Sequence, residues 1–285
     1  MAAKASALDV DQVMLDLEDA IAPSAKPQAR QQAKESIDRF DWSGKILSLR
    51  VNDVTTPWFE RDVLDVVAAV GHKLDTIVLP KASQPSDVRT LALLLARVER
   101  ERNFTRAIGI EPQIESAQGL TAVEAIAAAH ERVESLTFGP ADFAASIGSP
   151  VLTIGGHATE YPGHVWHYAL SRIVVAARTF GLAAIDGPYG VLRDERALLE
   201  SATMARALGC DGKWAIHPDQ IATIARVFTP SDDEVARARR IAEQYEGASS
   251  SGASGAVSYE GELVDAASAR LAQTILKHAP KTPDP

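Results

Sequence analysis

The sequence predicts an α/β protein organised as a TIM-type (β/α)8 barrel of parallel strands, and three observations support this class. Apolar runs alternate with amphipathic stretches at a period of about 25 to 35 residues, which is the spacing of strand-helix units. Glycine and proline separate these stretches. The 285 residues also suffice for one such barrel, which commonly occupies about 250 residues.

Seven short apolar runs are typical of buried parallel strands. The predicted strands are residues 12–18, 45–52, 76–80, 108–115, 134–139, 183–187 and 212–217. The predicted helices between them are residues 25–40, 58–70, 85–103, 117–130, 164–180 and 195–208. Residues 4–11 resemble the end of a helix, so we expect the barrel to lack its usual first strand.

The C-terminal part of the sequence departs from the barrel pattern. We expect the barrel to occupy residues 1–229 and a charged amphipathic helix to follow at 230–247. Serine and glycine dominate residues 248–256, which predicts a flexible linker. Apolar periodicity returns at 257–279 and predicts a helical arm that docks on a neighbouring subunit, whereas residues 280–285 are expected to be disordered.

Composition excludes several classes of partner. The formal net charge is −9, which argues against nucleic-acid binding because phosphate neutralisation requires clustered lysine and arginine. No apolar stretch reaches the roughly 18 residues of a membrane span, and residues 1–10 lack the features of a signal peptide. The single cysteine, Cys210, cannot form an internal disulfide. We therefore expect a cytoplasmic protein with no nucleic-acid or membrane partner.

Two acidic residues indicate a metal site. Glu115 and Asp142 each end an apolar run that predicts a strand, and they lie one strand-helix-strand repeat apart. Parallel strands in a barrel deliver their C-terminal residues to one rim, so these two carboxylates should converge. Carboxylates held close together repel each other unless a cation lies between them, and their hard oxygens suit Mg²⁺ or Mn²⁺. The sequence therefore predicts a metal-dependent enzyme.

Arg50 ends another predicted strand of the same sheet, so it should face the same rim. An arginine in this position can hold a carboxylate or a developing oxyanion by charge-assisted hydrogen bonds. The alternative is an ion pair at the rim with Asp53 or Glu60.

Further polar residues lie at other strand ends. The segment LDLEDAIAP places Asp16, Glu18 and Asp19 together, and one of them is a candidate to orient metal-bound water or the arginine. A cluster of salt bridges is the alternative. Asp186 and His217 end the last two predicted strands, where a ligand-facing turn is favoured.

Other chemistries have less support. His157, His164 and His167 suggest zinc, but no cysteine or glutamate completes a convincing ligand set. The sequence contains no P-loop, no G-x-G-x-x-G after a strand, no G-x-S-x-G and no C-x-x-C. Kinase, dehydrogenase and serine hydrolase functions are therefore not indicated.

A set of motifs, in order along the chain, carries a family resemblance. They are MLDLEDAIAP, LRVND, VLPKA, PQIESAQG, FGPADFAASIG, AIDGPYG, GKWAIHPDQI and YEGELVD. Together they resemble the citrate lyase β-subunit-like acyl-CoA lyases of the HpcH/HpaI aldolase superfamily, over about residues 11–278. VLTIGG, YPGHVWHY, AIDGPYG and GKWAIHP look more like the malyl-CoA and β-methylmalyl-CoA lyase branch than like the citrate lyase subunit.

The resemblance implies roles for individual residues. Glu115 and Asp142 match the family's Mg²⁺ ligands, and Arg50 matches its substrate-binding arginine. Asp265 matches a catalytic aspartate on a C-terminal arm that reaches the active site of an adjacent subunit. The resemblance thus implies a homotrimer, or a hexamer built from trimers.

Substrate contacts are implied in the same way. Ala141 with Asp142, and Ile216 with His217, match contacts to the acyl-CoA substrate. Family members begin with a further strand followed by basic and aromatic residues that contact CoA, and this sequence lacks that segment.

The implied reaction is a Mg²⁺-dependent, reversible carbon-carbon cleavage. Malyl-CoA or β-methylmalyl-CoA would give acetyl-CoA or propionyl-CoA and the small 2-oxo acid glyoxylate. Three alternatives remain open. They are a citramalyl-CoA lyase or citrate lyase β-subunit, a malyl-CoA thioesterase, and a non-catalytic CoA-binding protein.

Overall fold

The computed structural model describes residues 2–150, 152–156, 163–250 and 256–279. The chain divides into two compact units, Met1–Ile221 and Ala222–Pro285. The division falls within one helix, shortly before residue 229, where the sequence predicted the end of the barrel.

The first unit is built on seven parallel strands that pair in the order of the sequence. They are β1 Gln12–Asp16, β2 Ile46–Arg50, β3 Thr76–Leu79, β4 Gly109–Ile114, β5 Ser135–Phe138, β6 Ala183–Asp186 and β7 Gly212–Lys213. Each predicted strand is present, although all are shorter than predicted. Within the described residues the sheet runs from β1 to β7 without a pairing between these two strands. The α/β class with a parallel sheet is therefore confirmed.

The two faces of the sheet differ in chemistry, because side chains alternate along a strand. In β2, Leu47 and Leu49 are fully buried among apolar side chains, whereas Ser48 and Arg50 carry polar groups to the other face. On that inner face the buried Glu111 accepts hydrogen bonds from Gln12, Ser48, Thr76 and Ser135. The inner face is thus a polar surface shared by five neighbouring strands.

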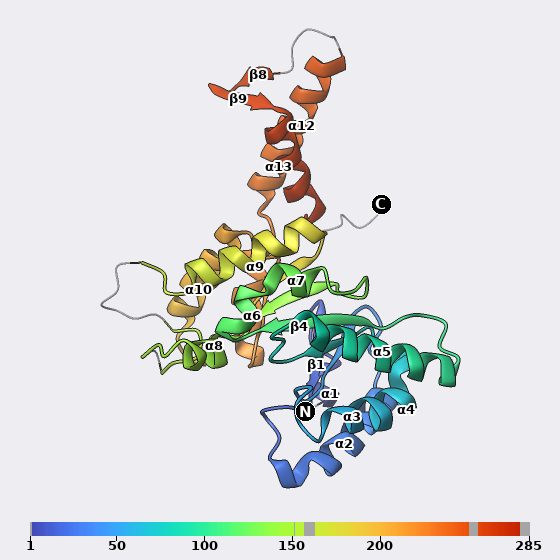
Figure 1. Ribbon diagram of the computed structural model, residues 1–285. Helices are drawn as coiled ribbons and strands as arrows, with labels where there is room; N and C mark the ends of the chain where they lie inside the picture. Colours follow the sequence, from blue (N-terminus) through green and yellow to red (C-terminus); the bar gives the residue numbers. More distant parts are fainter. Residues whose placement is uncertain (1, 151, 157–162, 251–255, 280–285) are drawn as a thin grey trace. The chain divides into compact units, whose positions relative to one another are not determined.

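Helices follow the strands and lie outside the sheet (Figure 1). They are α1 Ala2–Ala5, α2 Lys26–Arg39, α3 Phe59–Arg61, α4 Ala68–Val70, α5 Pro85–Arg102, α6 Ala117–Thr121, α7 Val123–Ala127, α8 Pro140–Ser146, α9 His167–Phe180 and α10 Glu195–Leu208. Short helical turns η1 Pro23–Ala25, η2 Asp62–Val67, η3 Gly71–Lys73 and η4 Pro218–Gln220 complete the unit.

Local signals set several helix ends. Gln84 and Asp87 form a reciprocal capping box at the start of α5, and Asn103 closes this helix in the left-handed conformation. The single helix predicted at 58–70 is wrong in detail, since a π-helical segment interrupts it at η2. The helix predicted at 117–130 is two short helices, α6 and α7. In the described residues no helix is both long and apolar enough to cross a membrane.

The second unit is a helical hairpin with a small sheet. It contains nearly all of α11 Ile221–Phe228, then α12 Asp232–Ser250, the antiparallel strands β8 Ala256–Tyr259 and β9 Glu262–Asp265, and α13 Ala266–Lys277. Arg237 of α12 pairs with Glu262 at 2.6 Å, and Arg240 donates to the Tyr259 hydroxyl at 2.7 Å. The predicted arm therefore begins with two strands rather than a helix.

Two predictions for this region lie largely outside the described residues. Of the predicted linker at 248–256, α12 covers the first residues and β8 begins at the last, while residues 251–255 are not described. The predicted disordered tail at 280–285 is not described either. Docking of the arm on a neighbouring subunit stays a prediction.

Candidate active site

The carboxyl ends of the parallel strands bring several predicted residues to one edge of the sheet. Arg50 is the last residue of β2, Asp186 is the last residue of β6, and Glu115 follows β4 directly. The prediction that Asp142 ends a strand is wrong, because β5 ends at Phe138 and Asp142 lies in the first turn of α8. A carboxylate is favoured there by the partial positive charge at a helix N-terminus.

Glu115 is a buried carboxylate held at both oxygens. The backbone N–H of Lys81 donates to Oε1 at 2.7 Å, and Nε2 of Gln113 donates to Oε2 at 2.6 Å. Burial, followed by the negative charge of Asp142, raises the pKa of Glu115 to about 8. The two carboxylates predicted to converge are therefore close enough to influence each other.

Gly139, between β5 and α8, gives Glu115 its space. A Cβ atom at this position would lie 2.3 Å from Oε2 of Glu115 and 2.8 Å from Nε2 of Gln113. Neither neighbour is free to retreat, because both are buried and bonded to each other. Glycine is therefore required here for the carboxylate to occupy its position.

Arg50 is fixed by two acidic residues of the LDLEDAIAP segment. Its Nε and Nη2 atoms donate to the two oxygens of Asp16 at 2.8 and 2.6 Å, and Nη1 lies 3.3 Å from Oε2 of Glu18. The alternative partners Asp53 and Glu60 were wrong. The guanidinium also lies over the Trp214 ring, 5.8 Å from its centre.

The charges around Arg50 keep it protonated. Burial would lower the pKa of Arg50, but the hydrogen bond to Asp16 and the charges of Asp16 and Glu18 outweigh burial, so the pKa is raised overall. Burial would likewise raise the pKa of Asp16, but the hydrogen bond and the charge of Arg50 lower it overall. The pair is thus a preformed cation with a bidentate anchor.

Lys81 is a site residue that the sequence reasoning missed. Its Nζ lies 2.5 Å from Oε1 of Glu18 and 3.3 Å from Oδ1 of Asp19. Burial would lower the pKa of Lys81, but the hydrogen bond and the charge of Glu18 raise it. Its place just after a predicted strand, in the quoted VLPKA motif, was the signal that could have identified it. Gln113 could have been found from its position two residues before Glu115, on the same face of β4.

Asp186 is already compensated within the protein. Its Oδ2 pairs with Nζ of Lys213 at 2.6 Å, and Nζ also donates to the carbonyl of Gly187 at 2.7 Å. Both side chains of the pair are almost fully buried. The structure thus gives Asp186 a lysine partner from the next strand, rather than a contact with Glu115 or Asp142.

The predicted acyl-CoA contacts lie on exposed or partly exposed segments. Ala141 is exposed in the first turn of α8. The backbone N–H of Ile216 donates to Oε1 of Gln220 at 2.9 Å, and Nδ1 of His217 accepts from the backbone N–H of Asp219 at 3.2 Å. The prediction that His217 ends a strand is wrong, because β7 ends at Lys213 and both Ile216 and His217 lie in the turn that follows it.

Asp265 belongs to the second unit, at the end of β9. It caps α13, because Oδ1 accepts from the backbone N–H groups of Ala267 and Ser268 at 2.9 and 3.0 Å. The hydrogen bond from Ser268 is the main cause that lowers the pKa of Asp265. The residue is thus an ionised carboxylate with an ordered backbone support.

The donor set of Glu115 and Asp142 fits Mg²⁺. This ion keeps several water ligands and commonly binds through one or two protein carboxylates. Among the described residues no three His, Cys, Asp or Glu side chains gather as a metal cluster. Two carboxylate ligands therefore match magnesium. Of the three histidines that suggested zinc, His157 lies outside the described residues.

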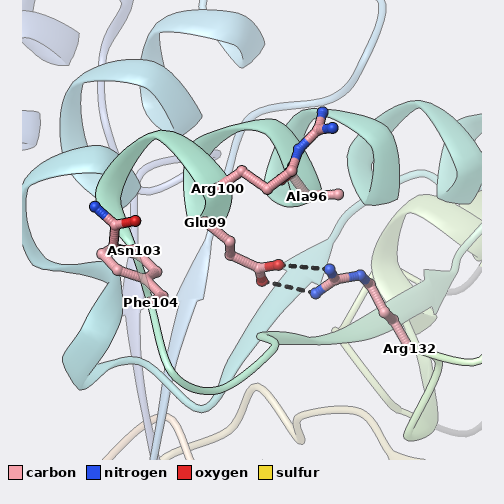
Figure 2. A pocket seen from close by; sticks show the side chains of 6 residues that line it. All are labelled: Ala96, Glu99, Arg100, Asn103, Phe104 and Arg132. Carbon is pink, nitrogen blue, oxygen red and sulfur yellow. Dashed lines mark hydrogen bonds and ion pairs between the residues drawn. The ribbon is translucent and has the colours of Figure 1, made fainter.

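A separate pocket lies near the amino ends of β4 and β5. It is lined by Ala96, Glu99, Arg100, Asn103, Phe104 and Arg132 (Figure 2). Arg132 crosses it to Glu99 with two hydrogen bonds, at 2.7 and 2.6 Å. None of the predicted site residues lines this pocket, and its internal ion pair indicates a structural role.

The fold and the site together define an α/β protein with an acidic, metal-suited site at the carboxyl ends of parallel strands. The model of the HpcH/HpaI aldolase/citrate lyase family matches residues 1–218. The chain therefore belongs to the HpcH/HpaI aldolase/citrate lyase family. The family predicted from the motifs is confirmed.

Curated relatives point to one branch of this family. An L-malyl-CoA/β-methylmalyl-CoA lyase of Cereibacter sphaeroides is 43% identical over 96% of this chain and 88% of its own length. A malyl-CoA/β-methylmalyl-CoA/citramalyl-CoA lyase of Chloroflexus aurantiacus is 35% identical over 95% of this chain and 81% of its own length. Citrate lyase subunit β of Leuconostoc mesenteroides is 31% identical over 98% of this chain and 89% of its own length.

A solved structure agrees with this placement. The protein CitE of Mycobacterium tuberculosis, in complex with magnesium, acetoacetate and coenzyme A, superposes with a TM-score of 0.76. It is 30% identical and the match covers 97% of this chain and 92% of that one. That relative binds a magnesium ion, a small oxo acid and coenzyme A.

Proposed function

We propose that this protein is a Mg²⁺-dependent lyase that reversibly cleaves malyl-CoA or β-methylmalyl-CoA to glyoxylate and acetyl-CoA or propionyl-CoA. The observation that carries the proposal is the convergence of Glu115, Asp142 and a bidentately anchored Arg50 at one edge of the sheet. The names of the curated relatives support a carbon-carbon lyase acting on acyl-CoA. They do not favour a thioesterase or a non-catalytic binding protein.

Glu115 and Asp142 are the proposed metal ligands. A bound Mg²⁺ supplies Lewis-acid polarisation of the substrate's oxygen atoms and a template for their orientation. The protein's part is to hold the two carboxylates. Lys81 and Gln113 fix both oxygens of Glu115, and Gly139 leaves room for them.

Arg50 is proposed to bind the substrate and to stabilise the oxygen that becomes negative during cleavage. Its side chain needs little reorganisation, since Asp16 already holds two of its nitrogens. A preorganised cation in a partly buried site stabilises developing charge more effectively than a mobile one in water. Glu18 supports the third nitrogen.

Asp265 is proposed as the general acid and base, acting in the site of an adjacent subunit. In cleavage the hydroxyl gives its proton to solvent water, a carbonyl forms at the carbinol carbon, and the bond from this carbon to the thioester α-carbon breaks. The electron pair of that bond remains on the α-carbon as a thioester enolate, which takes a proton from the carboxylic acid form of Asp265 and leaves the carboxylate. In condensation Asp265 removes the same proton. The lowered pKa of Asp265 favours the carboxylate, which is the form that accepts the proton in condensation.

Several finer features remain predictions of the sequence. They are the TIM-type (β/α)8 barrel without its first strand, Mn²⁺ as an alternative metal, substrate contacts by Ala141, Ile216 and His217, a homotrimer or hexamer, and a cytoplasmic location. Glu18 is supported as a residue that orients Arg50 by its 3.3 Å contact. Asp19 and Asp186 pair with lysines instead of Arg50: Asp19 with Lys81 and Asp186 with Lys213.

Products of malyl-CoA turnover test the proposed reaction. The purified protein with Mg²⁺ should release glyoxylate and acetyl-CoA in equal amounts, with no free thiol. Release of free thiol and malate instead would identify a thioesterase. Release of pyruvate from citramalyl-CoA, at a higher kcat/KM than glyoxylate from malyl-CoA, would favour the citramalyl-CoA alternative.

A further inference from the structure

We propose that Lys81 is a positioning residue that connects the two halves of the site. Its backbone fixes the metal ligand Glu115, and its side chain acts through Glu18 on Arg50. The inference rests on the proposed function for the roles of Glu115 and Arg50. It adds a residue that touches neither the metal nor the substrate in that function.

The backbone of Lys81 adopts an unusual conformation. Its φ angle is 53°, in the left-handed region that non-glycine residues rarely occupy. In the described part of the chain two other non-glycine residues, Asn103 and Glu260, adopt a positive φ angle, each in a position where this conformation is common. Asn103 caps the end of α5, and Glu260 lies in the tight turn between β8 and β9. Lys81 lies in the turn that directly follows β3, at the carboxyl end of the sheet where the site lies.

This conformation directs the Lys81 N–H to Oε1 of Glu115. A glycine would adopt it at lower cost. The presence of lysine therefore suggests that the side chain contributes something that glycine lacks. Strained backbone at a site is commonly retained where it orients a functional group.

The side chain contributes a second link. Glu18 is buried, and its two oxygens face different cations: Oε1 lies 2.5 Å from Nζ of Lys81 and Oε2 lies 3.3 Å from Nη1 of Arg50. Without the ammonium group, Arg50 would be the remaining cation paired with the Glu18 carboxylate, while Lys26 is held at the Glu18 carbonyl. The Glu18 carboxylate would then draw the guanidinium away from a substrate carboxylate. Lys81 thus leaves Arg50 available for an incoming anion.

Two substitutions separate the backbone role from the side-chain role. Lys81→Asn removes the ammonium but tolerates the left-handed conformation. Lys81→Val also removes the ammonium, and its β-branched side chain disfavours this conformation. Lys81→Arg retains a cation and serves as the conservative rescue. Lys73→Asn is the matched control. Lys73 precedes β3, whereas Lys81 follows it, and Lys73 also forms an ion pair with an aspartate, Asp38.

Calorimetric titration of each variant with Mg²⁺, and of the Mg²⁺-loaded protein with glyoxylate, tests both links. Lys81→Asn should bind Mg²⁺ like the parent protein but bind glyoxylate about 10-fold more weakly, and Lys81→Arg should recover most of that loss. Lys81→Val should also weaken Mg²⁺ binding about 10-fold or more. If Lys81→Val does not fold, the β-branched Lys81→Thr takes its place.

Parent-like glyoxylate binding by Lys81→Asn, or parent-like Mg²⁺ binding by the β-branched variant, would overturn the proposal. A loss of the same size in Lys73→Asn would also overturn it, because the effect would then not be specific to this site. Lyase turnover is measured separately. Absence of turnover in the parent protein, with the binding pattern as expected, would refute the proposed function and leave the role of Lys81 standing.

Discussion

Oε2 of Glu115 lies 2.3 Å from the point where a Cβ atom on residue 139 would stand, so the carboxylate depends on Gly139. The two residues come from neighbouring strands, and their closeness could not be read from either sequence segment alone. Gly139→Ala should displace the carboxylate and weaken Mg²⁺ binding by about 10- to 100-fold, as losses around metal ligands do. Calorimetry with Mg²⁺ measures this. Gly212→Ala is the control, since its new Cβ would lie an ordinary 3.7 Å from Ile185.

Substitution of the proposed metal ligands should abolish metal binding rather than weaken it. Glu115→Gln and Asp142→Asn each remove one of two carboxylates from a donor set that already has few protein ligands. We expect loss of detectable Mg²⁺ binding by calorimetry and loss of turnover, with the fold retained by circular dichroism. Unchanged Mg²⁺ affinity in both variants would place the metal elsewhere.

Asp265→Asn separates proton transfer from metal binding. Asparagine is as good a helix N-cap as aspartate, so α13 should keep its start. Turnover should fall by about 10²- to 10⁴-fold, because a general acid and base is lost. Exchange of the α-protons of acetyl-CoA in deuterated water should fall in parallel, while Mg²⁺ affinity stays the same. Asp194→Asn, at the N-cap of α10, controls for the effect of the same change at another helix start.

The buried pair of Asp186 and Lys213 should matter for stability. Lys213→Met would leave the Asp186 carboxylate buried without its cation, which typically costs about 3 to 5 kcal/mol. Urea unfolding followed by circular dichroism measures the change. The double variant Asp186→Leu with Lys213→Met should recover part of the loss, because no buried charge then remains unpaired. A single variant as stable as the parent would contradict the buried ion pair.

The only cysteine should be inert in the folded protein. Burial raises the pKa of the Cys210 thiol from 9.0 to about 12, and the thiolate is the reactive form. The unfolded chain loses this proton near pH 9.0, whereas the folded protein keeps it up to about pH 12. The free energy of unfolding is therefore unaffected by Cys210 below pH 9.0 and falls as the pH rises from 9.0 toward 12. Iodoacetamide at pH 8 should therefore label the native protein far more slowly than the urea-unfolded protein. Equal labelling rates would contradict the burial of Cys210.

Much of the fold could be predicted from the sequence because each strand is a short, strongly apolar run between turn residues. Strand ends were less accurate, as shown by Asp142, which the sequence placed at a strand end and the structure places in a helix. Periodicity does not distinguish the last residue of a strand from the first turn of the following helix. The π-helical interruption at η2 left no signal of this kind.

Part of the site was also within reach of the sequence. Glu115 and Arg50 were identified because strand ends of a parallel sheet share an edge. Lys81 was missed because its role depends on a backbone angle and on contacts with residues more than 30 positions away. Gly139 was missed because the need for glycine arises from a side chain on the neighbouring strand.

The most direct test of the central claim is the mass of the product formed from glyoxylate and acetyl-CoA or propionyl-CoA in the presence of Mg²⁺. The parent protein should form malyl-CoA or β-methylmalyl-CoA, and Glu115→Gln and Asp142→Asn should form neither. Absence of any condensation product with the parent protein, or equal product formation by these two variants, would contradict a Mg²⁺-dependent acyl-CoA lyase built on this site.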